Sequence, residues 1–407
     1  MNGIEWLPRL PDDWQVVRLS YICRVGTGEM DTVDADPEGD VPFYIRSPHV
    51  QRATRATGAG EAILTPGDGA VGEVFHHHRG GQFAAHQRVY VLSEFDQQKV
   101  EPRFFYWYFS SRFRMVTRGG TAKSTVESLR RPMFTSFPVV LPPLDDQWRI
   151  ADYLDRETAT IDTLIEKQRS LIAGLKVRRG AAIEQGVNGR LTSAGAERAT
   201  GPSWMGSIPV GWRSVPLWAM FRREKRTGFI DEPMVSVFRD YGVVFKSERA
   251  NLNETAEDRS IYQLVEPGWF VVNRMKAWQG SVGVSFIRGI SSGHYLCFRP
   301  LHEEDDRFLN WLFRSPQYRH GFAMLSRGVR PGQAEIDNDQ LRQMTVVLPP
   351  LNEQRAIADR LDRETARIDT LIAKADRFIE LAQERRAALI TAAVTGQLEI
   401  PTEESAA

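Results

Sequence analysis

The residues best suited to chemistry in this chain lie in loops that carry arginine, lysine and glutamine and have glycines within or beside them. Arginine and lysine pair with guanine, and glutamine pairs with adenine, in the major groove of DNA. Glycine lets the backbone approach a ligand closely. The loop at residues 76–82 has a counterpart at 274–279, and the loop at 118–124 has one at 327–333. The candidates for DNA contact in these loops are His77, Arg79, Gln82, Arg118, Lys123, Arg274, Lys276, Gln279, Arg327, Arg330 and Gln333.

Further basic residues form short clusters near these loops. Residues 103–131 contain seven basic side chains against one acid, Glu127, and a smaller cluster follows Arg213. Local basic clusters are what the neutralisation of DNA phosphates requires. For any single residue, a solvated charged surface is the alternative. These clusters add four candidates for DNA binding: Arg112, Arg114, Arg222 and Arg223.

Motifs for other chemistries are incomplete. Residues 67–72 fit GxGxxG, but no helical pattern follows them, and residues 119–124 lack the Gly-Lys pair of a phosphate-binding loop. The three histidines at 76–78 could bind a metal ion, but without a cysteine or a spaced acidic partner a polar loop is favoured. We therefore expect a non-catalytic chain with no metal site and no cofactor of its own.

Composition sets wider limits. The chain has 407 residues, 42% hydrophobic and 26% charged, which is typical of two or three globular domains. Lys+Arg and Asp+Glu are both 52, so net charge indicates no particular partner. The two cysteines are far apart, no apolar run is long enough to span a membrane, and the start lacks the pattern of a signal peptide. We expect a cytoplasmic protein without membrane contact.

A long internal repeat organises the chain. Residues 141–191 and 348–398 align without a gap at an offset of 207 and are identical at 28 of 51 positions. Weaker matches extend the repeat outward, because Pro11-x-x-Trp14 corresponds to Pro209-x-x-Trp212 and Trp107 corresponds to Trp311. Each half is thus a variable segment followed by a nearly constant one.

The constant segments have the pattern of long amphipathic helices. Apolar residues recur at steps of three and four, a Pro-Pro pair lies near the start of each segment, and Gly189 and Gly396 are plausible stops. Two such helices can bury their apolar stripes against each other, although packing inside one large domain is an alternative. Antiparallel pairing would set the variable domains apart about an approximate two-fold axis, whereas parallel pairing would bring them together. The alignment leaves both open.

The variable segments have short strand patterns with Gly/Pro turns and aromatic runs, which favour a mixed domain with the aromatics in its core. The predicted divisions are a first variable domain at 1–140, a constant helix at 141–190, a linker at 191–203, a second variable domain at 204–347, a second constant helix at 348–398 and a tail at 399–407.

These motifs resemble one family. Leu141-Pro142-Pro143-Leu144-x-x-Gln147 and its copy at 348–354 look like the helical repeats of type I restriction–modification specificity subunits. The two Pro-x-x-Trp starts resemble the openings of that family's target-recognition domains. The resemblance covers essentially the whole chain. It implies an α+β fold in which two mixed α/β target-recognition domains are separated by a long antiparallel two-helix coiled coil, with a pseudo-two-fold internal duplication.

The resemblance also implies a function and partners. Each recognition domain would read half of a bipartite, asymmetric sequence in double-stranded DNA. Two methylation subunits would dock on the chain and two restriction (motor–nuclease) subunits would complete the complex. S-adenosylmethionine, ATP and magnesium would belong to those partners. The alternative is a coiled-coil adaptor protein that contacts nucleic acid only non-specifically.

Overall fold

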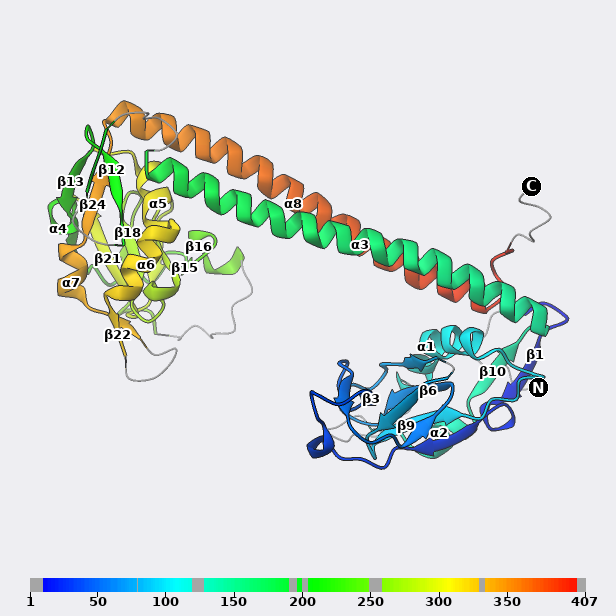
Figure 1. Cartoon of the computed structure of the whole chain (residues 1–407). Helices are drawn as coiled ribbons and strands as arrows, with labels where there is room; N and C mark the ends of the chain where they lie inside the picture. Colours follow the sequence, from blue (N-terminus) through cyan, green and yellow to red (C-terminus); the bar gives the residue numbers. More distant parts are fainter. Residues whose placement is uncertain are drawn as a thin grey trace. The chain divides into compact units, whose positions relative to one another are not determined.

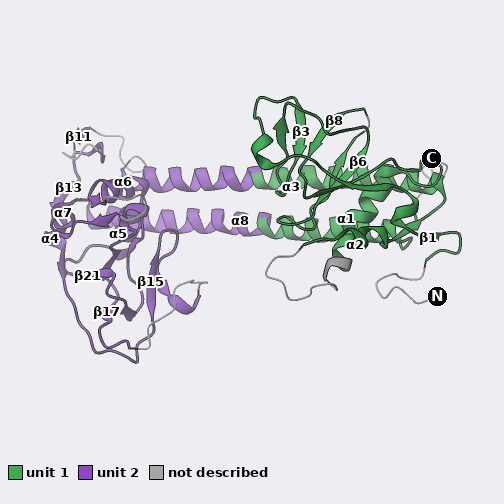
Figure 2. Cartoon of the chain, turned by 90° about the horizontal axis from the view of Figure 1, so that it is seen from below, with its two compact units in different colours: residues 1–169, 376–407 green, residues 170–375 purple. Residues whose placement is uncertain are grey.

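The computed structural model describes residues 10–78, 80–118, 128–189, 196–199, 204–248, 258–328 and 334–400, which form two compact units. Unit 1 comprises residues 1–169 and 376–407, and unit 2 comprises residues 170–375 (Figures 1 and 2). No helix in the described part of the chain combines the length and apolar character needed to cross a membrane.

Unit 1 is built around two four-stranded sheets. One is antiparallel with the order β2-β9-β6-β7, and the other has the order β4-β3-β8-β5 with β3 and β8 parallel. The elements before the first long helix are β1 (Gln15–Arg18), β2 (Arg24–Thr27), β3 (Val41–Tyr44), β4 (Gln51–Ala53), β5 (Gly58–Ala59), β6 (Ala62–Pro66), β7 (Phe75–His77), β8 (Gln82–Ala85), β9 (Val89–Ser93), α1 (Pro102–Arg118), α2 (Arg131–Thr135) and β10 (Pro138–Leu141).

Unit 2 repeats the first of these sheets. Its antiparallel order β14-β21-β18-β19 places β14, β21, β18 and β19 where unit 1 has β2, β9, β6 and β7. The elements are β11 (Glu197–Ala199), β12 (Ser207–Pro209), β13 (Arg213–Pro216), α4 (Leu217–Met220), β14 (Phe221–Arg223), β15 (Val235–Phe238), β16 (Gly242–Phe245), β17 (Gln263–Val265), β18 (Phe270–Asn273), β19 (Val282–Val284), β20 (Gly289–Ser291), β21 (Tyr295–Pro300), α5 (Asp306–Arg314), α6 (Pro316–Met324), β22 (Ser326–Arg327), β23 (Glu335–Ile336), α7 (Asn338–Gln343) and β24 (Thr345–Leu348). Because β11 lies within 191–203, part of the segment predicted as a linker is a strand.

Aromatic side chains form the core of both domains. In α1, Phe104, Phe105, Phe109 and Phe113 are fully buried, as predicted for the aromatic runs. The equivalent region of unit 2 is divided into α5 and α6, because Pro316 cannot continue the first helix and Ser315 caps the second.

The constant segments are α3 (Leu144–Val187) and α8 (Leu351–Val394), each a continuous helix of 44 residues. Both begin just after the Pro-Pro pair, where a buried glutamine fixes the entry. Gln147 Nε2 donates to the Pro142 carbonyl at 2.9 Å, and Gln354 does the same to Pro349 at 2.9 Å. Both helices begin three residues after the predicted starts at 141 and 348, because Leu141 and Leu348 end the strands β10 and β24.

The two helices pair antiparallel, which the ion pairs within each unit establish. In unit 1, the start of α3 lies beside the end of α8, and Arg386 forms a bidentate pair with Asp162 at 2.9 and 3.1 Å. In unit 2, Arg179 pairs with Asp369 at 2.9 and 3.3 Å. Arg179 and Arg386 are equivalent positions at the offset of 207, and so are Asp162 and Asp369. Each arginine therefore pairs with the aspartate of the other repeat. The predicted antiparallel pairing of the helices is confirmed within each unit.

A tryptophan joins each of these pairs to the β-rich domain of its unit. In unit 1, Arg386 lies over the Trp107 ring at 5.6 Å, and Trp107 Nε1 donates to Asp155 at 2.9 Å. In unit 2, Arg179 lies over Trp311 at 5.9 Å, and Trp311 Nε1 donates to Asp362 at 2.8 Å. We call these two sets junction clusters. Their members are Arg103, Trp107, Asp155, Asp162 and Arg386 in unit 1, and Arg307, Trp311, Asp362, Asp369 and Arg179 in unit 2.

The Pro-x-x-Trp motifs pack against the glycines that follow the C-terminal ends of the two long helices. Gly396 follows α8 with φ 70°, and a Cβ there would lie 2.8 Å from Pro11. Gly189 follows α3 with φ 73°, and a Cβ there would lie 2.5 Å from Pro209. Both positions need glycine for the left-handed backbone and for the close approach.

The seam between the helices supplies the first prediction. Ile161→Ala and Ile368→Ala, at side chains only 8% and 4% exposed, should each lower the free energy of unfolding by about 2–4 kcal/mol, because each leaves a cavity. Leu164→Ala and Leu371→Ala are matched controls at 41% and 49% exposure, and should cost less than about 1 kcal/mol. Urea unfolding of the four variants tests this, and equal losses would contradict the assigned seam.

Candidate functional site

Seven of the predicted DNA-contact residues belong to unit 1, and the structure describes only some of them. Arg79 and Lys123 lie outside the described residues, and for Arg118 only the backbone at the end of α1 is described. Gln82 is exposed at the start of β8. Arg114 is exposed on α1, where its Nε donates to the Gly72 carbonyl at 3.1 Å.

Two of the seven lie in the interior rather than on the surface. His77 is buried on β7, with its Nδ1 3.2 Å from the Tyr44 hydroxyl. Arg112 is 5% exposed, its Nη1 lies 3.7 Å from Met115 Sδ, and burial lowers the pKa of its guanidinium. The charge count along the sequence could not show which face of α1 each arginine occupies. Both side chains are buried, so neither belongs to the exposed surface of unit 1.

Two of the three histidines, His76 and His77, pack inside unit 1, whereas His78 is exposed. His76 Nε2 lies 2.9 Å from Glu61 Oε1, and the His76 ring stacks on Tyr106. Burial lowers the pKa of His78, and the neighbouring His76 lowers it further. Among the described residues, no group of three or more His, Cys, Asp or Glu side chains is arranged to hold a metal ion.

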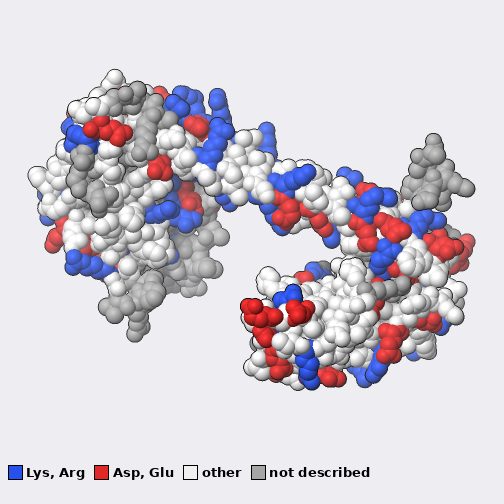
Figure 3. All heavy atoms as spheres, in the orientation of Figure 1, with Lys and Arg blue, Asp and Glu red and all other residues white. Residues whose placement is uncertain are grey.

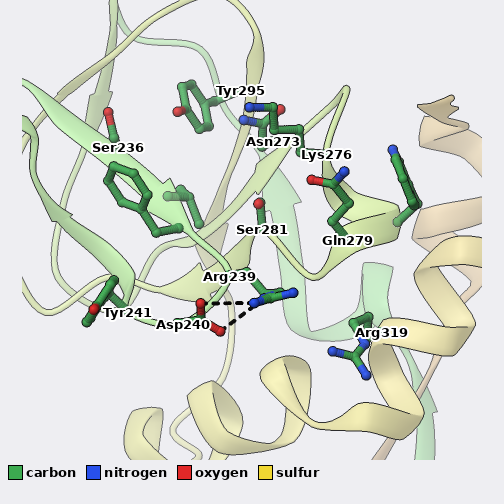
Figure 4. A pocket seen from close by; sticks show the side chains of 13 residues that line it. Ser236, Arg239, Asp240, Tyr241, Asn273, Lys276, Gln279, Ser281, Tyr295 and Arg319 are labelled. Carbon is green, nitrogen blue, oxygen red and sulfur yellow. Dashed lines mark hydrogen bonds and ion pairs between the residues drawn. The ribbon is translucent and has the colours of Figure 1, made fainter. Parts of the chain in front are cut away.

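Unit 2 brings two of the predicted residues to one hollow. Lys276 and Gln279 line a cavity of about 700 Å³ between the β15–β16 turn, the short 3-10 helix η4 (Ala277–Gln279) and α6. Figure 4 shows Arg239 near its middle, with Asp240 on one side and Gln279 and Arg319 on the other. We call this cavity the unit-2 hollow.

The unit-2 hollow is locally cationic. Arg239 is paired with Asp240, and the hydrogen bonds from Arg239 lower the pKa of that carboxyl. Within the described residues, the charged ends of Lys276 and Arg319 have no hydrogen-bond or ion-pair partner. Below the turn, Arg314 donates to the Asp240 carbonyl at 2.5 Å, and burial lowers its pKa to about 10. This arrangement can attract an anion and offer hydrogen-bond donors.

Three more predicted residues share a second hollow. Arg223, Arg274 and Arg327 line a cavity of about 350 Å³, in which Arg274 is ion-paired with Glu335. Arg222 is exposed next to it on β14. Arg330 and Gln333 lie outside the described residues.

The structure changes one of the loop equivalences drawn from the sequence. The loop at 274–281 connects β18 to β19, so its counterpart in unit 1 is the 67–74 loop between β6 and β7. The segment after β7, predicted as the counterpart, occupies a different place in the fold. Residues 76–82 and 274–279 share residue types, but the order of the strands makes 67–74 the equivalent of 274–281.

Arg239, Asp240 and Arg319 were missing from the predicted site residues. A signal for the first two exists, since Arg239-Asp240-Tyr241-Gly242 forms the turn of a hairpin and Gly242 has φ 72°. A turn that projects charged residues from a hairpin was a candidate for ligand contact. Arg319 lies on a helix, and nothing in the sequence alone placed it beside the hairpin.

Figure 3 shows acidic and basic side chains interspersed along α3 and α8 on the visible face. A face with charges of both signs favours DNA phosphates less than a basic cluster does, so the local basic clusters of the two units are the better candidates for that attraction.

The chain is similar to known proteins over most of its length. A family model for the type I restriction modification DNA specificity domain matches residues 11–172 and 245–377. The type I restriction enzyme EcoDI specificity subunit of Escherichia coli is 22% identical over 96% of this chain and 90% of its own length. The MjaVIII specificity subunit of Methanocaldococcus jannaschii is 22% identical over 98% and 95%.

Solved structures share the fold. A structure described as the basis of complex assembly and conformational transition of the type I R-M system superposes with a TM-score of 0.63 at 18% identity, over 96% of this chain and all of that one. The HsdS subunit from Thermoanaerobacter tengcongensis gives 0.52 at 16% identity, over 97% of this chain and all of that one.

The buried arginine of α1 supplies the second prediction. Arg112→Met should leave the urea midpoint unchanged or raise it, because a buried guanidinium without a carboxylate partner among the described residues carries a desolvation penalty. It should not change DNA affinity. Arg114→Met, on the exposed face of the same helix, is the matched variant and should weaken DNA binding. Equal weakening by both would show that Arg112 contacts the ligand.

Proposed function

The chain belongs to the family of type I restriction–modification DNA specificity subunits, and from this premise we propose that it reads a bipartite, asymmetric sequence in double-stranded DNA, one half through each recognition domain. It is the non-catalytic specificity subunit of such a system. The observation that carries the proposal is a duplicated scaffold with unlike surfaces. The two domains share the strand order of their antiparallel sheet.

The unlike surfaces support two different half-sites. The loop between β18 and β19 in unit 2 carries Lys276 and Gln279 into a cationic hollow. Its topological counterpart, 67–74 in unit 1, contains two acids and no lysine or arginine. Different side chains at equivalent places on one scaffold favour recognition of different bases.

The continuous helices support a fixed spacing between the half-sites. A helix of 44 residues spans roughly 66 Å at about 1.5 Å per residue. The antiparallel ion pairs hold the register of the two helices. We infer that the length of this pair sets the number of unread base pairs between the two recognised sequences.

The same helices provide a basis for protein partners. Leu164 and Leu371 are exposed equivalents at the offset of 207, and so are Leu171 and Phe378. A protein that binds one copy of this apolar surface finds a second copy, which supports docking of two methylation subunits. We propose that two restriction subunits complete the complex and that S-adenosylmethionine, ATP and magnesium act in these partners. One difference is Trp148, exposed beside Arg103, where the second repeat has Arg355.

Selection from random duplex DNA tests the function. The chain, co-expressed with a methylation subunit, should enrich two short sequences at one fixed spacing. The alternative is a coiled-coil adaptor, which the exposed apolar residues of the helices would also suit. That protein would bind DNA with a steep dependence on salt but no sequence preference. Enrichment without a shared sequence would therefore support the adaptor.

The spacing role yields a separate prediction. Inserting four residues after Leu171 and four after Phe378 adds about one turn, or roughly 6 Å, to both helices at equivalent places. The gap between the half-sites should grow by about one or two base pairs while both recognised sequences stay the same. Sequencing of the selected DNA measures this. A change in the recognised bases at unchanged spacing would contradict the spacing role.

A further inference from the structure

One arginine of the unit-2 hollow, Arg239, has a geometry suited to contact with a specific base. Arg239 lies at the turn between β15 and β16, and its side chain is 58% exposed. Nε donates to Asp240 Oδ1 at 3.0 Å, and Nη2 donates to Asp240 Oδ2 at 3.2 Å. The carboxylate thus occupies the side edge of the guanidinium, formed by Nε and Nη2.

The other edge of the guanidinium, the end formed by Nη1 and Nη2, stays open. Nη1 and the second hydrogen of Nη2 point the same way and have no hydrogen-bond partner among the described residues. Two parallel N–H donors match the O6 and N7 acceptors of guanine in the major groove. An arginine held by a carboxylate is also pre-oriented, so less side-chain entropy is lost on binding than for a free arginine.

Neighbouring residues leave room for this arginine and supply further polar groups around it. Gly280 has φ 91°, and a Cβ there would lie 3.2 Å from Arg319 Cδ and 3.5 Å from Arg239 Cγ. The two arginine stems therefore lie over a position without a side chain. Lys276 and Gln279 come from the adjoining turn and line the same hollow (Figure 4). The unpaired charges of Arg319 and Lys276 suit the neutralisation of DNA phosphates. Arg239 is oriented by Asp240, which suits a directional contact with a base.

We propose that the recognition domain of unit 2 reads a guanine through the open end of Arg239, with Asp240 as the residue that positions it. The proposal rests on the proposed function, because it assigns one base contact within the half-site of this domain. The ligand is a G·C base pair presented in the major groove.

The test compares the selected sequences of the Arg239→Ala variant and the wild-type chain, each with the methylation subunit. The wild type should select guanine at one position of one half-site. Arg239→Ala should lose that preference by about tenfold to a hundredfold and keep the other half-site and the spacing. Asp240→Asn should give a smaller loss at the same position, because the amide keeps one acceptor and loses the charge. Both variants should unfold at the wild-type urea midpoint, since the pair is exposed.

A matched control is Arg288→Ala. Arg288 belongs to the same domain and pairs with Glu232 and Glu266, but does not line the hollow. Its selected sequence should equal that of the wild type. Retention of every base preference in Arg239→Ala would overturn the proposal while leaving the specificity function intact. Failure of the wild type to select any sequence would overturn the function itself. A loss of preference at Asp240→Asn accompanied by a lowered urea midpoint would assign Asp240 a structural role and overturn its positioning role.

Discussion

The exchange of one arginine–aspartate pair between the two repeats is the constraint on which the rest of this architecture depends. Arg179 meets Asp369, and Arg386 meets Asp162, so each repeat supplies the acid for the other's base. A parallel pairing in register would set arginine beside arginine and aspartate beside aspartate, which is repulsive. Each pair is partly exposed and contributes little free energy alone. Its value lies in selecting direction and register, while the buried isoleucines supply most of the stability.

The recognition domains are fixed to this helix pair through the same charges. The Trp107 and Trp311 rings lie against the guanidinium groups of Arg386 and Arg179, respectively. Each indole N–H donates to a second aspartate, which lies about two helical turns before the aspartate of the ion pair. Shielding by the indole ring reduces the solvent screening of the ion pair. One set of side chains thus joins helix to helix and helices to domain. The variable surfaces can change without disturbing it, because they lie on the sheets and turns of the domains.

Much of this fold was predictable, and the parts that were not have physical reasons. The repeat, the helical periodicity and the Pro-Pro and glycine boundaries are local patterns, so α3 and α8 could be assigned within a few residues. The direction of their pairing required the contacts of Arg179 and Arg386. Among the candidate site residues, Lys276 and Gln279 were chosen from one loop of the sequence, and the structure adds that they line a hollow together with Arg239. His77 and Arg112 were predicted at the surface from charge and loop composition, whereas tertiary packing buried both. Sheet topology also reassigned the counterpart of the 274–281 loop, since equivalent strands in the two domains have little sequence in common.

The division of the chain between the units has a consequence for synthesis. Unit 2 is one continuous stretch of 206 residues, 170–375, whereas unit 1 needs residues from both ends of the chain. Ile390 and Val394 complete the hydrophobic core that contains Leu154 of unit 1. At about 5–20 residues per second, a ribosome takes roughly 10–40 s to make the intervening stretch. The first domain to emerge is therefore the last to be completed, and it waits with part of its core uncovered until the final helix arrives.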